Sequence, residues 1–206
     1  QRVLLVRYAE IHLKGLNRPY FERMLVERIK QALEPLTAKI VREQGRVFVS
    51  EIPEELIDKA ADRLCEVFGV HSVSIAACVE KDYSVISAAV REMLRPQLAE
   101  SDKPVRFKVF ARRADKRFPM NSDEICRELG HDLLDAFSCL TVDVHKPQLK
   151  VTVEIRQEQA YLLTDEKKGP GGMPVGCNGK AMLLISGGID SPVAGYMIAK
   201  RGVRLI

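Results

Sequence analysis

The segment of residues 169–179 constrains the fold of this chain more than any other part of the sequence. It reads Gly-Pro-Gly-Gly-Met-Pro-Val-Gly-Cys-Asn-Gly, so seven of its eleven residues are glycine or proline. Glycine loses much conformational entropy on folding and proline lacks a backbone donor, so such a run cannot continue a helix or a central strand. We therefore interpret it as an inter-domain linker.

Apolar periodicity upstream of the linker predicts a first α+β unit. The predicted elements are a strand over residues 3–6, a helix from Arg18 that Pro35 stops, strands around residues 40–41 and 47–49 joined by a turn at Gln44-Gly45, a helix from Pro53 to Gly69, and a strand over residues 70–79. This β-α-β-β-α-β order is typical of a ferredoxin-like domain.

A second unit follows between residues 83 and 163. Its predicted elements are a helix over residues 83–98, a strand over residues 105–110, a helix with Asn121 or Ser122 as N-cap, and a β-hairpin of residues 149–155 and 161–163. The strand at residues 105–110 alternates apolar and basic side chains, which predicts one face in the core and one cationic face in solvent.

Composition and charge exclude several classes of protein. Lys and Arg number 32 against 28 Asp and Glu, a net charge of +4, and 46% of the residues are hydrophobic. These values exclude a disordered tail, a collagen-like chain and a disulfide-dense miniprotein. Five cysteines without a C-x-x-C pair and four scattered histidines argue for reduced, mostly buried thiols and against zinc. Because no apolar run approaches about 20 residues and no signal-peptide pattern is present, we expect a cytoplasmic protein without a membrane partner.

The sequence Ser-Gly-Gly-Ile-Asp-Ser-Pro at residues 186–192 is the strongest sign of chemistry. It lies between the apolar run of residues 181–185, which predicts a strand buried on both faces, and a helix from Pro192 to Lys200 that Gly202 stops. Two glycines allow successive N–H groups and the helix N-terminus to converge on an anion. Open α/β sheets bind nucleotides at this kind of strand–loop–helix junction.

The loop differs from a Walker A loop because it lacks the G-K-[ST] ending. Without a lysine on the β- and γ-phosphates, it suits a reaction in which pyrophosphate leaves ATP while a carboxylate helps to position Mg²⁺. Attack on the α-phosphate would then give an adenylated intermediate. The alternative is a plain βα turn in which Asp190 or Ser191 caps the helix.

Positive charge is concentrated in residues 101–118. The basic residues of this window are Lys103, Arg106, Lys108, Arg112, Arg113, Lys116 and Arg117, and the acidic ones are Asp102 and Asp115. They alternate with Phe107, Phe110 and Phe118, so the window could neutralise phosphates and offer an aromatic surface to an unpaired base. The alternative is a solvated strand face whose aromatic side chains lie in the core.

Four segments together resemble the family of tRNA 4-thiouridine synthetases. They are RYAEIHLKG at residues 7–15 with Asn17-Arg18, RRADKRFP at residues 112–119, GGMPVG at residues 171–176 and LISGGIDSPVA at residues 184–194. The resemblance covers essentially the whole chain in the family's order. It implies an α+β ferredoxin-like domain at residues 1–78, a THUMP RNA-binding domain at residues 79–168, a linker at residues 169–179, and the first β-loop-α of a parallel, Rossmann-like PP-loop domain at residues 180–206.

The resemblance also implies a reaction. Members of the family hold the acceptor end of tRNA with the first two domains, and adenylate O4 of the uridine at position eight with the third. Sulfur from a cysteine desulfurase, carried as an enzyme persulfide, then displaces AMP to give 4-thiouridine. ATP and Mg²⁺ are the implied cofactors, and a homodimer and a second role in making the thiazole of thiamine are further expectations.

Site residues follow from matching positions. Ser186, Gly187, Gly188 and Ser191 are expected to hold phosphate, Asp190 to serve the metal and catalysis, and Leu184 and Ile185 to offer backbone groups to adenine. The candidate RNA contacts are Arg106, Lys108, Arg112, Arg113, Lys116 and Arg117, and neutralising Arg112 and Arg113 is expected to flatten the salt dependence of RNA binding.

Two departures from the family pattern qualify these expectations. Ala9 stands where the family has glycine, and the persulfide cysteines of the family have no match here, Cys177 included. We therefore expect that these 206 residues alone do not complete the reaction. Two alternatives stay open: a non-catalytic RNA-binding module, and a PP-loop ligase or amidotransferase acting on a small molecule, which would leave the basic window unexplained.

Overall fold

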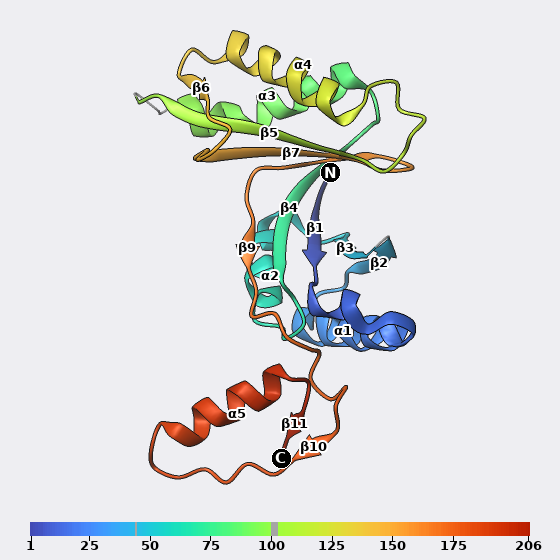
Figure 1. Ribbon diagram of the computed structural model, residues 1–206, viewed down its shortest axis with the longest axis vertical. Helices are drawn as coiled ribbons and strands as arrows, with labels where there is room; N and C mark the ends of the chain where they lie inside the picture. Colours follow the sequence, from blue (N-terminus) through green and yellow to red (C-terminus); the bar gives the residue numbers. More distant parts are fainter. Residues whose placement is uncertain (44, 100–102) are drawn as a thin grey trace. The chain divides into compact units, whose positions relative to one another are not determined.

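A computed structural model describes residues 1–43, 45–99 and 103–206 of the chain (Figure 1). The chain forms two compact units. The middle unit consists of Ala76–Asp165 with Gln1–Arg2, and the terminal unit consists of Val3–Ile75 with Glu166–Ile206. Gln44, in the predicted turn, and Ser101 and Asp102, in the basic window, lie outside the described residues.

The terminal unit contains the predicted β-α-β-β-α-β succession. The elements are β1 (Arg2–Arg7), the 3-10 helix η1 (Glu10–Asn17), α1 (Arg18–Leu33), β2 (Lys39–Glu43), β3 (Arg46–Ser50), the 3-10 helix η2 (Glu54–Leu56), α2 (Ile57–Leu64) and β4 (Ser72–Val79). Of these, only Arg2 of β1 and residues 76–79 of β4 belong to the middle unit. The strands lie in the order β2-β3-β1-β4, with β3 antiparallel to both β1 and β2. This order confirms the ferredoxin-like fold.

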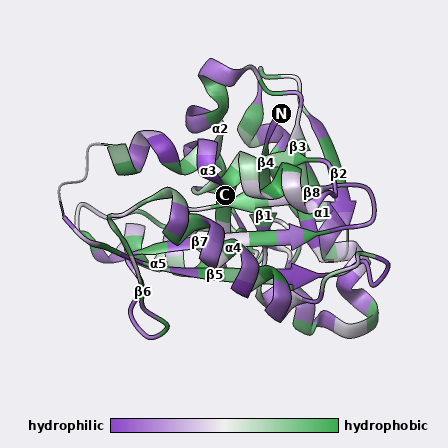
Figure 2. Cartoon of the chain, turned by 90° about the horizontal axis from the view of Figure 1, so that it is seen from above, coloured by the Kyte–Doolittle hydropathy of each residue, from purple (hydrophilic) through white to green (hydrophobic). Residues whose placement is uncertain are grey.

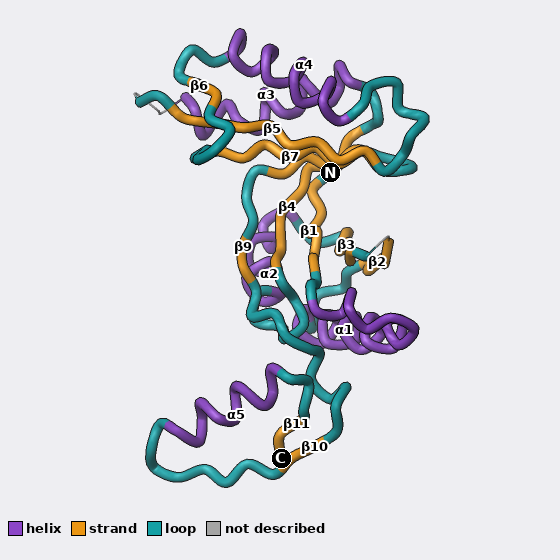
Figure 3. The backbone as a smooth tube through the Cα atoms, viewed as in Figure 1, coloured by secondary structure: helices purple, strands orange, loops and turns teal. Residues whose placement is uncertain are grey.

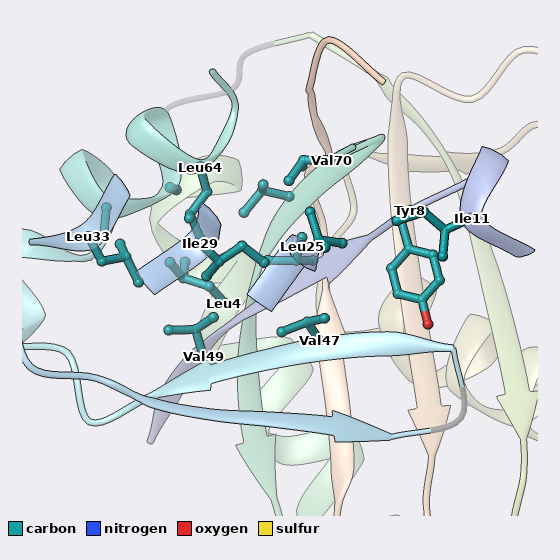
Figure 4. Close-up of a cluster of buried hydrophobic side chains, with 14 of the residues drawn as sticks. Leu4, Tyr8, Ile11, Leu25, Ile29, Leu33, Val47, Val49, Leu64 and Val70 are labelled. Atoms are coloured by element: carbon teal, nitrogen blue, oxygen red, sulfur yellow. The ribbon is translucent and has the colours of Figure 1, made fainter. Parts of the chain in front are cut away.

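Helical periodicity explains how α1 packs on this sheet. Its buried residues, Phe21, Leu25, Ile29 and Leu33, recur at three- and four-residue spacing and so share one face of the helix. In Figure 4, Leu25 and Ile29 lie among Leu4 of β1 and Val47 and Val49 of β3. Burying each such side chain contributes about 1.5–3 kcal/mol, so the contact between α1 and the sheet stabilises the unit by several kcal/mol.

Helix α2 is shorter than predicted. It ends at Leu64 rather than at Gly69, because the chain leaves the helix through successive tight turns. The N–H groups of Glu66 and Val67 donate to carbonyls three residues back, those of Arg63 and Leu64. These turns let Val67 pack against the core before the chain reverses at Gly69, where φ is +100°.

The middle unit places two helices on one face of a mixed sheet (Figure 1). Its elements are α3 (Tyr83–Ala99), β5 (Val105–Arg113), α4 (Ser122–Ala136), β6 (Leu140–Val142), β7 (Leu149–Ile155) and β8 (Ala160–Leu163). The strand order is β4-β8-β7-β5-β6, in which β5 is parallel to β6 and β7, and β7 and β8 form the predicted antiparallel hairpin. The short strand β6 has no counterpart among the predicted elements.

Helix α4 begins as the sequence predicts. The Asn121 side chain accepts hydrogen bonds from the N–H groups of Asp123 and Glu124, both at 3.0 Å, and the Glu124 carboxylate accepts from the Asn121 N–H at 2.7 Å. This reciprocal pair is a capping box, which satisfies amides that the helix itself leaves unpaired. Hydrophobic and hydrophilic residues alternate around the helix (Figure 2), and its apolar face packs into the core of the unit.

In the C-terminal part of the chain, a strand and a helix follow in the predicted order, and two further short strands lie one before and one after them. The elements are β9 (Lys167–Lys168), β10 (Lys180–Ala181), α5 (Asp190–Lys200) and β11 (Arg204–Leu205). Strands β10 and β11 are parallel, as the start of a parallel α/β domain requires. Helix α5 begins two residues before the expected Pro192 and ends at the expected Lys200.

The prediction of a strand buried on both faces at residues 181–185 is wrong. Strand β10 has two residues, the chain continues to α5 as loop (Figure 3), and the side chains of Leu184 and Ile185 are 82% and 74% exposed. In the part of the chain that the structure describes, β11 is the single strand hydrogen-bonded to β10. An apolar run needs neighbours on both faces before it can be buried.

Residues 169–179 contain no helix and only an isolated bridge at Met173, as their composition predicts. The segment is nevertheless packed within the terminal unit. Met173 is 3% exposed and belongs to the core around α1, and Gly171 exchanges backbone hydrogen bonds with Gly69 and Val70, each at 2.8 Å. Elsewhere, each of the five cysteines is a partly exposed free thiol, so the expectation that most are buried is wrong.

Candidate functional site

Two serine hydroxyls shape the loop between β10 and α5. The Ser191 hydroxyl accepts a hydrogen bond from the Ser186 N–H at 3.1 Å, and the Ser186 hydroxyl accepts a longer one from the Gly188 N–H at 3.4 Å. The two hydroxyl oxygens are 3.4 Å apart. These bonds bring both ends of the loop together at the start of α5.

No side chain of the described residues caps the first turn of α5. Its N-cap is Ile189, so neither Asp190 nor Ser191 caps the helix, and the interpretation of the segment as a plain capped turn loses its support. The N–H groups of a first helical turn need partners from outside the helix, and they attract anions. In α4 the Asn121 side chain accepts from these N–H groups, whereas in α5 the corresponding N–H groups can bind an external anion.

The glycines of the loop are not required by the packing of this chain. Neither Gly187 nor Gly188 has a positive φ. A Cβ added to Gly187 would meet nothing within 4 Å, and one added to Gly188 would meet only the Ser186 hydroxyl at 3.8 Å. The space above the backbone is open, so residues 186–191 fit a ligand such as a triphosphate that approaches the main chain closely.

Asp190 lies at the N-terminal end of α5 with its side chain exposed. Among residues 1–43, 45–99 and 103–206, none donates a hydrogen bond to its carboxylate. An exposed carboxylate beside an anion site is a suitable ligand for Mg²⁺. Leu184 and Ile185, on the other side of the loop, are exposed, so their backbone groups can be reached by a nucleotide base.

The side chains of the basic window that lie on β5 point alternately to an outer and to an inner face of the strand. Arg106, Lys108, Phe110 and Arg112 lie on the outer face, whereas Phe107 and Val109 are buried. The Lys108 ammonium lies 4.9 Å from the centre of the Phe110 ring, and Phe110 is 37% exposed. One aromatic ring of the window therefore accompanies the cations on the surface.

The remaining aromatic residues of the window belong to the core. Phe107 and Phe118 are both buried among apolar side chains of the middle unit. For these two, the interpretation as core residues is correct. Phe110 alone among the three can offer a face to an unpaired base.

Arg113 has a different position from Arg112. Its guanidinium donates to the backbone carbonyls of Phe118 and Met120 at 3.1 and 3.3 Å and so fixes the loop after β5. Arg112 is exposed and, within the part of the chain that the structure describes, forms no hydrogen bond through its side chain. The Arg112 guanidinium can therefore be reached by a ligand, whereas Arg113 supports the loop.

Asp115 lies in the loop after β5 and partly neutralises the positive charge there through ion pairs with Lys81 and Arg117. Its buried carboxylate accepts from Arg117 Nε at 3.0 Å and from Lys81 Nζ at 2.8 Å, and these hydrogen bonds hold the pKa of Asp115 well below its usual range. The Arg117 side chain is still 78% exposed, and Lys116 is exposed beside it. Both can face a ligand, and Arg117 does so with a fixed orientation.

The structure also contains a groove in the middle unit that the sequence does not reveal. It has a volume of about 390 Å³ and runs between β5, α4 and the residues after β6. Its lining includes Phe107, Lys108, Cys126, Gly130, Leu134 and Val142. The one local signal is Gly130, a glycine inside a helix whose Cβ position is open.

A second groove of about 680 Å³ lies in the terminal unit between α1 and β2. Glu22 organises its polar wall, since its carboxylate accepts from Tyr8, from Arg18 at 2.7 Å and from Arg42 at 3.5 Å. Burial and the bond to Glu22 raise the pKa of Tyr8 to about 12. The sequence singles out Tyr8 and Arg18 but does not show that Glu22 joins them.

Three family models match the chain in succession. They are the ThiI ferredoxin-like domain at residues 3–74, the THUMP domain at residues 80–165 and the thiamine biosynthesis protein (ThiI) at residues 176–206. A probable tRNA sulfurtransferase of Lachnoclostridium phytofermentans is 47% identical over 207 residues, which cover 99% of this chain and 52% of that protein. The chain belongs to the ThiI family of tRNA sulfurtransferases. A second such relative, from Moorella thermoacetica, is also 47% identical, over 98% of this chain and 50% of its own length.

Solved structures similar to this ThiI-family chain agree with its fold. A 4-thiouridine synthetase in complex with RNA and bound ATP is 39% identical, with a TM-score of 0.82 over 99% of this chain and 51% of that one. The protein PH1313 of Pyrococcus horikoshii is 34% identical, with a TM-score of 0.88 over 100% of this chain and 67% of that one.

A more distant likeness, to TrmN of Thermus thermophilus at 23% identity and a TM-score of 0.56, covers 82% of this chain and 46% of that one and concerns the fold alone. The ThiI-family chain spans about half the length of the curated relatives it matches. No helix in its described part is both long and apolar enough to cross a membrane.

Proposed function

We propose that this chain is the RNA-binding part, with the start of the ATP-binding part, of an enzyme that makes 4-thiouridine in tRNA. The observation that carries the proposal is the agreement along 99% of the chain with a 4-thiouridine synthetase solved with RNA and ATP. The open loop at residues 186–191 and the cationic face of β5 supply matching chemistry. A PP-loop ligase acting on a small molecule would not need that cationic face.

The residues present fit the phosphates of ATP. The N–H groups of residues 186–191 and the uncapped start of α5 would hold them, with Gly187 and Gly188 leaving room for their approach. Asp190 would hold Mg²⁺, and the backbone at Leu184 and Ile185 would contact adenine. ATP supplies the AMP group that turns O4 of the uridine into a leaving group.

The residues of the middle unit would bind and orient the RNA. Arg106, Lys108 and Arg112 present their charges from one face of β5, where Phe110 can stack on an unpaired base. Lys116 and Arg117 extend this surface into the following loop. Arg113 positions that loop and does not itself contact RNA.

Several finer features belong to the same proposal. The modified base is the uridine at position eight, the sulfur comes from a cysteine desulfurase, the enzyme works as a homodimer, and it also supplies sulfur for the thiazole of thiamine. The domains divide at residues 1–78, 79–168, 169–179 and 180–206. Because Met182, Leu184 and Ile185 lie exposed and no persulfide cysteine is matched, this chain alone binds RNA without completing the reaction.

Nucleoside mass spectrometry of tRNA tests the proposal. Cells lacking the full-length gene are complemented with the wild type, with Asp190→Ala, or with Asp135→Ala as a matched control on the exposed side of α4. We expect 4-thiouridine to vanish in the deletion strain and to return with the wild type and the control, but not with Asp190→Ala. Persistence of 4-thiouridine in the deletion strain would refute the assignment.

A further inference from the structure

Gly172 lies where the chain crosses the end of α5. Its φ is +77°, and its N–H donates to the Glu10 carboxylate at 3.1 Å. A Cβ at this position would clash with the carbonyl oxygen of Lys200 in the last turn of the helix. Only glycine therefore permits both the backbone conformation and the close crossing.

Residues that follow Gly172 bind the C-terminal end of α5. The Met173 N–H donates to the Lys200 carbonyl at 2.9 Å, and the Asn178 side-chain amide donates to the Arg201 carbonyl at 2.6 Å. The last carbonyls of a helix lack partners within the helix. The segment at residues 169–179 supplies them here, so the end of α5 is attached to this segment.

The same segment is attached to the ferredoxin-like core on its other side. Gly171 forms its two backbone bonds with Gly69 and Val70, and the Met173 side chain is buried in the core around α1. A ring contact adds to this attachment, since Tyr196 of α5 meets Phe68 edge to face at 5.0 Å between centres. Glu10, in the RYAEIHLKG stretch at residues 7–15, adds a side-chain contact by accepting from the Gly172 N–H.

We infer that Glu10 and Gly172 are positioning residues for the loop at residues 186–191. Glu10 and Gly172 hold α5 in one orientation on the ferredoxin-like core. The loop at the opposite end of α5, which binds ATP if the proposed function is correct, is thereby held in place as well. Helix α5 has 11 residues and is stiff, so a shift at Lys200 is transmitted to Asp190. Misplacing a reacting group by about 1 Å can cost up to about 100-fold in rate.

Two neighbouring glycines provide a matched pair of variants. Gly171 and Gly172 both have positive φ, +66° and +77°, so alanine strains the backbone at either position. An added Cβ meets nothing within 4 Å at Gly171, whereas at Gly172 it strikes Lys200. The difference between Gly172→Ala and Gly171→Ala therefore reports the clash with Lys200 alone, because the backbone strain is common to both variants.

The first test is hydrogen exchange in the full-length protein. For Gly172→Ala we expect amides of residues 186–201 to exchange at least about 10-fold faster, as in a locally opened region, while α1 and α2 keep their wild-type protection. Gly171→Ala should exchange like the wild type over residues 186–201. Equal exchange in the two variants, or loss of protection throughout α1 and α2, would overturn the inference.

The second test separates positioning from folding and from binding. Glu10→Gln keeps a side-chain acceptor for the Gly172 N–H and should behave as the wild type, whereas Glu10→Ala should lower kcat for 4-thiouridine formation about 10-fold with tRNA affinity unchanged. Glu27→Ala, an exposed carboxylate on α1, is the control. Unchanged kcat in Glu10→Ala overturns the inference. If the wild type shows no thiolation activity, the proposed function is refuted. The hydrogen-exchange comparison of Gly172→Ala with Gly171→Ala then still tests whether the crossing at Gly172 holds α5 in place.

Discussion

Residues 3–6 and residues 182–185 are both uninterrupted apolar runs, yet they end in opposite environments. Leu4, Leu5 and Val6 are 0% exposed, whereas Met182, Leu184 and Ile185 are 74% exposed or more. Strand β1 lies between β3 and β4 and packs under α1. The second run follows β10, which pairs with β11 alone among the described strands. Burial of an apolar run thus depends on neighbours that other parts of the sequence provide.

Substituting one leucine in each run tests this comparison with the largest expected effect. Leu4→Ala should lower the free energy of unfolding by about 2–5 kcal/mol, because it leaves a cavity in a packed core. Leu184→Ala should change it by less than about 0.5 kcal/mol, because the side chain is already in water. Urea unfolding followed by circular dichroism measures both. Similar losses in the two variants would contradict the comparison.

The exposed loop after the second run should affect function without affecting stability. We expect Asp190→Asn to lower 4-thiouridine formation in the full-length protein at least about 100-fold, equivalent to about 2.7 kcal/mol, because the carboxylate proposed to hold Mg²⁺ would be lost. The unfolding midpoint should match that of the wild type. Reduced activity together with reduced stability would indicate a structural role for Asp190.

Arg112 and Arg113 repeat the contrast between exposed and packed side chains at adjacent positions. Arg113→Ala should cost about 1.5 kcal/mol of stability, since two backbone carbonyls lose a charged donor. Arg112→Ala should leave stability unchanged and reduce the slope of log K against log salt for tRNA binding by about 0.7–0.9. Filter binding over a salt series and urea unfolding of both variants distinguish the roles. A flatter slope for Arg113→Ala at unchanged stability would reverse them.

The N-termini of α4 and α5 also differ. The first N–H groups of α4 donate to the Asn121 side chain, whereas those of α5 have no side-chain cap among the described residues. Asn121→Ala should lower the free energy of unfolding by about 1 kcal/mol through loss of the capping box. Asn121→Ser restores an N-cap acceptor and serves as the control, with stability close to that of the wild type. Equal losses for alanine and serine would show that Asn121 acts through something other than its cap.

The smallest expected effect concerns pH and the buried carboxylate of Asp115. Hydrogen bonds from Arg117 and Lys81 lower the pKa of Asp115 from its ordinary value of 3.8. The ionised Asp115 carboxylate therefore contributes its full stabilisation of the folded state above pH 3.8, and this contribution is lost as the pH falls through the lowered pKa. The stability difference between wild type and Asp115→Asn should be constant from about pH 5 to 8 and narrow below about pH 4. Thermal unfolding across this range measures it. A difference that varies near pH 7 would assign the effect to another group.

Local sequence signals predicted much of the fold because they depend on near neighbours in the chain. Helical spacing predicted α1, the N-cap candidates Asn121 and Ser122 predicted the start of α4, and alternation of apolar and basic residues predicted the two faces of β5. The loop at residues 186–191 was visible for the same reason, since glycines and serines at fixed spacing dictate local backbone geometry. These features need no knowledge of distant contacts.

Tertiary structure decided which predicted residues act together. The sequence by itself determined that residues 3–6 and 182–185 are apolar, that residues 169–179 contain no regular element, and that seven cations gather in one window. Only the packing of distant segments buried one apolar run and exposed the other, turned Arg113 toward the loop carbonyls, and brought Glu10 to Gly172, 162 positions away. Burial and pairing are properties of what surrounds a side chain, and those surroundings come from residues that the local sequence does not contain.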